Sequence, residues 1–279
     1  MSDPAIKDRE PALKRASTGV AYRTAGTGVP LFLLHGGSGS WTHWIRNVNP
    51  LSSHFAVYAL DLPGYGQSTA PSLDIPIKDY IGIVTETVSE IAGPSPLGLS
   101  GFSFGGFLAA GVAATLGSQV SGVSLIGPAG FARPEGRNLG LESRHRLEQR
   151  LGRSASEAEI QEMHRGNLAK LMIYKEELID DLAIATQMSN VSQMRFDSRP
   201  LSWSGQMADY LAALSSPVIF ISGDHDRSAH PSVENRFQQC RATCPNIRLQ
   251  IIPDCGHWAQ YEKPDTVNRM LIDFHRPTG

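Results

Sequence analysis

A serine flanked by glycines, in the stretch Gly101–Gly106, constrains this chain more than any other feature. The residues before it, Leu97–Ser100, are apolar and small, as in a buried strand, whereas Phe104–Thr115 is rich in Ala, Gly and Leu, as in a close-packed helix. Gly-x-Ser-x-Gly between a strand and a helix is the pattern of a nucleophile elbow, whose tight turn lifts the serine hydroxyl above the sheet edge. We therefore expect Ser103 to be a nucleophile; the motif alone also fits a plain glycine-rich turn.

The elbow predicts two partners later in the chain, because a lone serine hydroxyl is a weak nucleophile. In this architecture the order is Ser, then Asp or Glu, then His. Val218–Ser222 is predicted to be a strand and is followed by Asp224 and Asp226, and the alternating stretch Arg248–Ile252 is followed by His257. Each candidate lies just past a strand, where α/β sheets place their ligands. His257 is expected to accept the serine proton, with an aspartate holding its imidazole.

With these residues in place, the chain resembles the α/β-hydrolases over about residues 20–274. The run Leu31–Gly37 is similar to the strand and His-Gly turn of that family. The resemblance implies an oxyanion hole made by the backbone N–H groups of Gly37 and Phe104, with Gly36 beside the substrate. Glycine suits this turn because the backbone must approach the substrate oxygen without a Cβ in the way.

The family pattern Gly-x-x-Asp selects Asp226 as the acid, and Asp224 remains the alternative. The cluster around these residues, up to His230, also has the composition of a metal site, but it is better explained as a triad loop. We therefore expect no metal and no cofactor. His35 is expected to brace its loop rather than to do chemistry.

Alternating strands and helices predict an α/β fold with a mostly parallel central sheet flanked by helices. Phe55–Leu60 and Val120–Ile126 are predicted to be buried strands. An apolar stripe at helical spacing predicts a helix over Ile77–Ile91, and Pro264 is expected to begin the last helix.

The stretch that follows the sixth strand breaks this alternation, because it contains helical patterns and no convincing strand. The resemblance implies that it is a helical cap at residues 128–210, between two parts of the hydrolase core at residues 1–127 and 211–279. Ser154 and Glu157 match a capping box, which predicts a helix start there.

Composition fits a single-chain enzyme that acts on a small molecule. The chain has 279 residues, 41% of them hydrophobic, and a net charge of −2, which gives no basis for binding nucleic acid or an anionic membrane. It has no run of about 18 apolar residues, and residues 1–15 lack the apolar stretch of a secretory leader. The three cysteines favour a reducing cytoplasm over a disulfide framework. A homo-oligomer is left open.

The substrate class rests on finer resemblances. Asp254–Glu262 and Arg46–Val48 are similar to the meta-cleavage-product (C–C bond) hydrolases, which bind a dienoate carboxylate through a cap arginine. By position, Arg195 and Arg199 are both candidates for that arginine. The chain departs from this branch at the turn after His-Gly, Gly37–Ser40, which lacks the usual proline.

A second departure is Phe102, which stands before the serine where this branch carries Asn. An apolar residue there favours a neutral ester, so we predict a carboxylic ester hydrolase with C–C hydrolysis as the close alternative. A non-catalytic receptor on the same fold is the distant alternative. The residues expected to contact substrate are Gly36, Phe102, Arg195 and Trp258.

Overall fold

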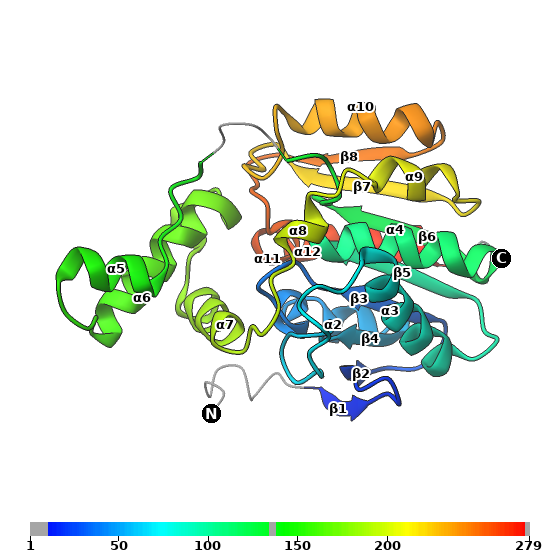
Figure 1. Ribbon diagram of the computed structural model, residues 1–279. Coiled ribbons are helices and arrows are strands. Elements are labelled where there is room, and N and C mark those ends of the chain that lie inside the picture. The colour runs from blue at the N-terminus through cyan, green and yellow to red at the C-terminus, as the bar shows by residue number, and fades with distance from the viewer. Residues whose placement is uncertain (1–10, 134–137, 277–279) are drawn as a thin grey trace.

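Eight strands form one sheet in the computed structural model, which describes residues 11–133 and 138–276 (Figure 1). Residues 1–10 of the polar N-terminal stretch lie outside this description. The sheet order is β1-β2-β4-β3-β5-β6-β7-β8; the β1–β2 and β2–β4 pairs are antiparallel, and all the other pairs are parallel. The strands are β1 (Ala12–Arg15), β2 (Ala21–Ala25), β3 (Pro30–Leu34), β4 (Ala56–Leu60), β5 (Leu97–Phe102), β6 (Val120–Ile126), β7 (Val218–Gly223) and β8 (Arg248–Ile252). The predicted mostly parallel sheet is thus confirmed.

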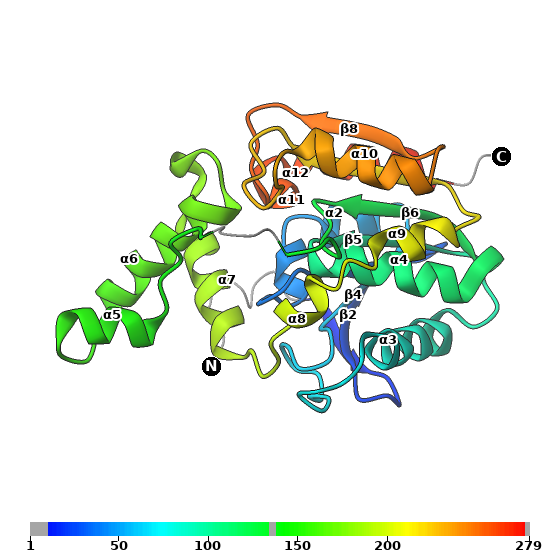
Figure 2. The ribbon, with the colours of Figure 1, turned by 45° about the horizontal axis from the view of Figure 1, so that its top comes forward.

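Helices cover both faces of this sheet, which explains why its central strands are buried throughout (Figures 1 and 2). One face packs against α3 (Ile77–Ala92), α4 (Phe104–Leu116), α9 (Met207–Ala212) and α10 (Val233–Thr243). The other face packs against η1 (Trp41–Trp44), α2 (Val48–Ser52), α11 (Ala259–Glu262) and α12 (Pro264–His275). A short 3₁₀ turn, η2 (Gly117–Gln119), leads from α4 into β6.

Several predicted elements match the structure closely. The apolar stripe over Ile77–Ile91 forms α3, and its core face includes the buried side chains of Tyr80, Val84 and Val88. The last helix, α12, begins at Pro264 as predicted, because proline lacks the N–H that the first turn leaves unpaired anyway.

Within the described residues, every regular element between β6 and β7 is a helix, and irregular segments connect these helices. In both views α5 and α6 stand away from the sheet, and α7 lies between them and the core (Figures 1 and 2). The predicted boundary at residue 210 falls inside α9, which packs with α4 and α10 in the layer beside the sheet. The remaining elements are α5 (Arg144–Leu151), α6 (Glu157–Asn167), the π-helical η3 (Leu168–Met172), η4 (Glu176–Leu178), α7 (Asp181–Ser192) and α8 (Arg199–Ser202).

The predicted capping box at Ser154 and Glu157 is wrong by two residues. The structure forms it between Ser156 and Glu159: the serine side chain accepts from the Glu159 N–H, and the glutamate accepts from the Ser156 N–H. Arg153 also pairs with Glu159 at 2.7 Å, which holds this glutamate in the first turn. The additional ion pair favours the later register over the earlier Ser-x-x-Glu match.

No helix within the described ranges is long and apolar enough to cross a bilayer. The three cysteines are free thiols, and two of them, Cys240 and Cys255, are buried. Burial raises the pKa of Cys240 to about 12, so this thiol stays protonated.

Backbone segments cross in direct contact where β5 leads into α4. A Cβ placed on Gly101 would lie 2.2 Å from the carbonyl oxygen of Gly105, and one on Gly105 would lie 2.2 Å from the carbonyl oxygen of Leu34. Both obstacles are backbone atoms of buried elements, so they cannot move aside as a flexible side chain does. The glycines of the motif are therefore required by packing.

Because of this close backbone contact, we expect glycine-to-alanine substitutions at two helical glycines to change the free energy of unfolding in opposite directions. Gly105→Ala should lower the free energy of unfolding by about 1–3 kcal/mol, because the added methyl overpacks the crossing. Gly82→Ala on α3 has nothing within 4 Å of the new Cβ, so it should raise the free energy of unfolding by about 0.5–1 kcal/mol. Urea unfolding measures both, and a neutral Gly105→Ala would contradict the required close approach.

A buried histidine on α12 links stability to pH. Nε2 of His275 lies 2.7 Å from the hydroxyl of Ser124 on β6, and burial lowers the pKa of His275 to about 3. In the unfolded chain its pKa is near the ordinary value of about 6.5. Below pH 6.5 the unfolded state therefore binds a proton that the folded state does not bind until near pH 3, and the free energy of unfolding falls as the pH falls.

His275→Gln should therefore flatten the pH dependence of stability. Each such histidine contributes a slope of about 1.4 kcal/mol per pH unit in this window, so the variant should lose about 2 kcal/mol less than the wild type between pH 6.5 and pH 5. Urea unfolding at the two pH values measures the difference. Equal losses in both proteins would show that His275 does not titrate in this way.

Candidate active site

Ser103 sits at the turn from β5 into α4 in a backbone conformation that is rare for a residue with a side chain. Its φ is 53° and its ψ is −114°. Backbone hydrogen bonds hold the turn: the Ser103 N–H donates to Ile126 at 2.9 Å, and its carbonyl accepts from Ala129, Gly106 and Phe107 at 2.9, 3.0 and 3.3 Å. Ser103 is half-buried while its neighbours in the motif are buried. The strained turn thus leaves the serine as the accessible residue of the elbow.

The loops after β7 and β8 bring Asp226 and His257 together. Nδ1 of His257 lies 2.9 Å from Oδ2 of Asp226, and both side chains are buried. Burial alone would raise the pKa of the Asp226 carboxyl, but the nearby His257 and the hydrogen bonds from His257 and Ser228 outweigh it and lower this pKa to about 2. The carboxylate is therefore ionised at neutral pH and fixes the ring through Nδ1.

Asp224, the alternative acid, faces elsewhere. Its side chain is exposed and accepts from the backbone N–H of Cys255 at 3.2 Å. The neighbouring His225 stacks on Tyr174 at 3.7 Å between ring centroids. The structure therefore places Asp226, and not Asp224, against His257.

Ser228 is a member of this cluster that the sequence analysis missed. Its hydroxyl oxygen lies 2.9 Å from Nδ1 of His257, and its N–H donates to Oδ1 of Asp226 at 2.7 Å. An aspartate that accepts from the backbone two residues further on is a common turn, so this signal was present in the sequence. Gly127 completes the enclosure, because a Cβ there would lie 2.8 Å from Oδ2 of Asp226.

The two predicted oxyanion donors lie on segments that touch each other. Gly37 follows β3 in the His-Gly turn, and Phe104 is the first residue of α4, where backbone N–H groups have no partner within the helix. The turn contacts the elbow at Gly36, where a Cβ would lie 3.1 Å from Cβ of Ser103. Within the described chain, no hydrogen bond uses the N–H of Gly37 or of Phe104.

Two buried histidines brace the His-Gly turn from below. His35 accepts from the N–H of Leu62 at 2.9 Å through Nε2, and Nδ1 of His43 accepts from the N–H of Gly36 at 3.2 Å. Burial lowers the pKa of His35 to about 4 and that of His43 well below its ordinary value. Both rings are therefore neutral at pH 7. His35 thus has the contacts of a loop brace.

Two residues expected to contact substrate lie beneath the site. Phe102 is fully buried, with its ring 4.7 Å from that of His257. Trp258 is also fully buried: its indole N–H donates to the carbonyl of His43 at 2.9 Å, and its ring stacks on Tyr261 at 4.1 Å. In this structure neither side chain is accessible to a ligand.

The two candidate arginines are already engaged. The guanidinium of Arg195 donates to the carbonyl oxygens of Gly66 and Ser68 at 3.0 and 2.6 Å. Arg199 is exposed and pairs with Asp197 at 2.7 Å. Neither presents an unpaired guanidinium to a carboxylate.

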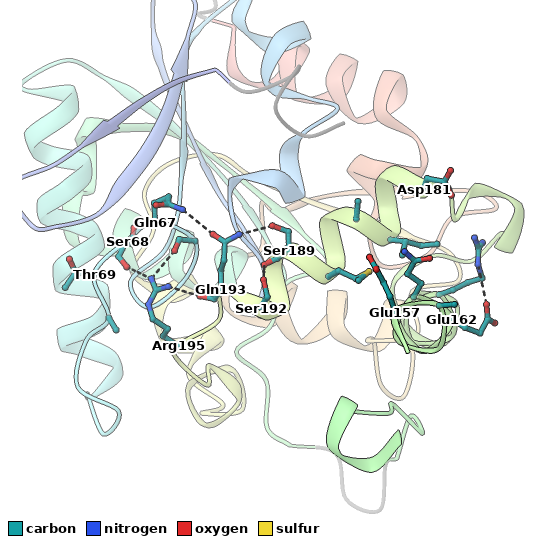
Figure 3. Close-up of a pocket in the computed structure, with 18 of the residues that line it drawn as sticks. Gln67, Ser68, Thr69, Glu157, Glu162, Asp181, Ser189, Ser192, Gln193 and Arg195 are labelled. Carbon is teal, nitrogen blue, oxygen red and sulfur yellow. Dashed lines mark hydrogen bonds and ion pairs between the residues drawn. The ribbon is translucent and has the colours of Figure 1, made fainter. Parts of the chain in front are cut away.

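Arg195 also lines a broad cleft of about 1490 Å³ between the loop at residues 66–70 and helices α6 and α7 (Figure 3). Figure 3 shows the guanidinium turned toward Ser68 and Gln193. The residues that line this cleft do not include Ser103, Asp226 or His257. It is therefore separate from the cluster around the elbow.

Known proteins resemble this chain over most of its length. A 2-hydroxy-6-oxo-6-phenylhexa-2,4-dienoate hydrolase of Burkholderia cepacia is 24% identical, covering 90% of this chain and 88% of the relative. The dihydrolipoyllysine-residue acetyltransferase component of the acetoin cleaving system of Cupriavidus necator is 26% identical over 90% of this chain, which spans only 65% of that relative.

Solved structures show the same fold. A meta-cleavage product hydrolase from Pseudomonas fluorescens has a TM-score of 0.70 and 22% identity, with 95% of this chain and 97% of the other covered. The naproxen esterase of Bacillus subtilis has a TM-score of 0.72 and 19% identity, with 95% and 90% covered. The sequence profile of the alpha/beta hydrolase family matches residues 31–270. The chain therefore belongs to the α/β-hydrolase family.

Proposed function

We propose that this α/β-hydrolase is a serine hydrolase of small, neutral, largely apolar carboxylic esters, acting through Ser103, His257 and Asp226. The observation that carries the proposal is the 2.9 Å hydrogen bond between His257 and the buried Asp226 carboxylate. Both residues follow strand ends on the parallel sheet that also positions the elbow. Nucleophile, base and acid thus come in the chain order that the family uses.

In the proposed reaction the Ser103 hydroxyl attacks the ester carbonyl while His257 takes its proton through Nε2. Asp226 holds the opposite nitrogen of the ring and stabilises the imidazolium. The N–H groups of Gly37 and Phe104 donate to the oxyanion. The alkoxide then leaves with the proton from His257, and a water activated by the same histidine hydrolyses the acyl-serine.

We propose a neutral substrate because neither candidate arginine is free to pair with a carboxylate. A substrate carboxylate in an apolar pocket needs a charged partner, because an unpaired buried charge is too costly. Arg199 is paired with Asp197, and Arg195 is bound to backbone carbonyls. These contacts favour an acyl group without a carboxylate.

Hydrolysis of a C–C bond in a 2-hydroxy-6-oxo-dienoate is the second candidate, favoured by the activity named for the Burkholderia cepacia relative. It would use the same serine, histidine and aspartate, and it would need one arginine to turn toward the substrate. A receptor on this fold would bind a ligand without turnover. Measured turnover of an aryl ester separates the enzyme from the receptor.

Substitution of the proposed catalytic residues and of Asp224 tests the assignment of the acid. Ser103→Ala, His257→Ala and Asp226→Asn should each lower kcat for an aryl ester by about 10³-fold or more, because the three residues act as a unit. Asp224→Asn is the matched control and should retain activity, since its side chain is exposed and contacts a backbone N–H. Loss of activity in Asp224→Asn with a normal Asp226→Asn would overturn the assignment.

Kinetics with two substrates distinguish an ester hydrolase from a C–C hydrolase. The wild type should turn over p-nitrophenyl esters with a higher kcat/KM than a 2-hydroxy-6-oxo-dienoate. Arg199→Ala should leave both values unchanged, and Arg195→Ala should affect both substrates alike. Steady-state kinetics with the two substrates measures these values. If the wild type prefers the dienoate, and either arginine variant loses this preference through a rise in KM for the dienoate only, the protein is a C–C hydrolase.

A further inference from the structure

A short strap after α7, residues 195–198, lies against the core loop at residues 64–68. The backbone N–H of Arg195 donates to the carbonyl of Gly64 at 2.9 Å, and its guanidinium donates to two further carbonyls of this loop at 3.0 and 2.6 Å. The next residue, Phe196, is buried against Gly64, where a Cβ would lie 2.4 Å from that of Phe196. These contacts give Arg195 a structural role and fix the end of the strap.

Ser198, the last residue of the strap, directs its hydroxyl toward the His-Gly turn. Ser198 is the N-cap of α8, a position where serine normally bonds to a backbone N–H of the first turn, yet it makes no such bond. Its side chain is buried at 5% exposure. A Cβ placed on Gly37 would lie only 2.8 Å from Oγ of Ser198. The hydroxyl therefore lies beside the residue whose N–H is the proposed oxyanion donor.

The hydroxyl of Tyr65 lies next to Ser198. Its ring is fully buried and packs edge-on against His35 at 5.2 Å between centroids. Its hydroxyl lies among the Ser198 hydroxyl and the backbone of Ser38 and Ser198, and within the described chain it makes no hydrogen bond of good geometry. Burial raises the pKa of Tyr65 to about 12, so the phenol keeps its proton. A buried donor without a partner is costly, and the neighbouring Ser198 hydroxyl can accept from Tyr65 while it donates its own proton elsewhere.

We propose that the Ser198 hydroxyl, supported by Tyr65, is a third hydrogen-bond donor to the oxyanion that forms beside Gly37. This inference rests on the proposed function. The strap belongs to the segment predicted as the cap, so one donor would come from the cap side and two from the core. The tetrahedral intermediate would then be fully stabilised only while the strap is docked on the loop at residues 64–68.

The test uses two readouts on the full chain: steady-state hydrolysis of p-nitrophenyl acetate, and the rate of labelling by an aryl fluorophosphonate. Ser198→Ala should lower kcat and the labelling rate by about 10²-fold with KM unchanged, because the donor acts on developing charge. Tyr65→Phe should change both in the same direction by a smaller factor. Ser202→Ala on α8 is the control and should behave like the wild type.

Stability gives an independent check of the contact. Gly37→Ala should be destabilising, and adding Ser198→Ala should recover part of the loss, since the atom 2.8 Å from the new Cβ is removed. If Ser198→Ala keeps the wild-type rates, or if the stability effects of Gly37→Ala and Ser198→Ala are strictly additive, the inference about Ser198 is wrong and the proposed function is unaffected. A wild type that neither hydrolyses the ester nor reacts with the fluorophosphonate would overturn the proposed function as well.

Discussion

The candidate site depends on the backbone crossing at the start of α4. Gly101 and Gly105 allow the end of β5 to contact the backbone of the first turn of α4, and Gly105 also lies against the end of β3 at Leu34. This contact fixes the strand that carries the elbow relative to the strand that leads into the His-Gly turn. Backbone hydrogen bonds to β6 and to the segment after it hold Ser103 at a positive φ. Strain in one residue is thus maintained by the packing of three elements.

Near this crossing, neighbouring groups satisfy the buried charge of Asp226. The Asp226 carboxylate accepts hydrogen bonds from His257 and from the backbone of Ser228, which keeps it ionised despite burial. The bracing histidines His35 and His43 are neutral instead. A buried anion beside an imidazole is the arrangement that acyl transfer requires, since an imidazolium would then have its counter-charge in place.

Residues marked by local patterns were predictable from the sequence, and residues brought together only by tertiary packing were not. The places of Ser103 in a tight turn and of Asp226 in a loop after a strand could be predicted, because glycine spacing and strand ends are local signals. Trp258 lies next to His257 in the sequence, but its side chain turns into the core, a direction that no motif encodes. Ser198 carries no motif, since its contact with the His-Gly turn comes from the docking of the strap. Ser228 is intermediate, because its turn is local but its contact with the imidazole is not.

The proposed activation of Ser103 by His257, which Asp226 holds in place, can be tested by locating the covalent adduct of an aryl fluorophosphonate. Peptide mass spectrometry after brief labelling should find the phosphonyl group on Ser103 in the wild type. It should find almost none in His257→Ala under the same conditions, because the serine is then not activated. An adduct on another residue, or equal labelling of Ser103 in the two proteins, would show that His257 does not activate Ser103.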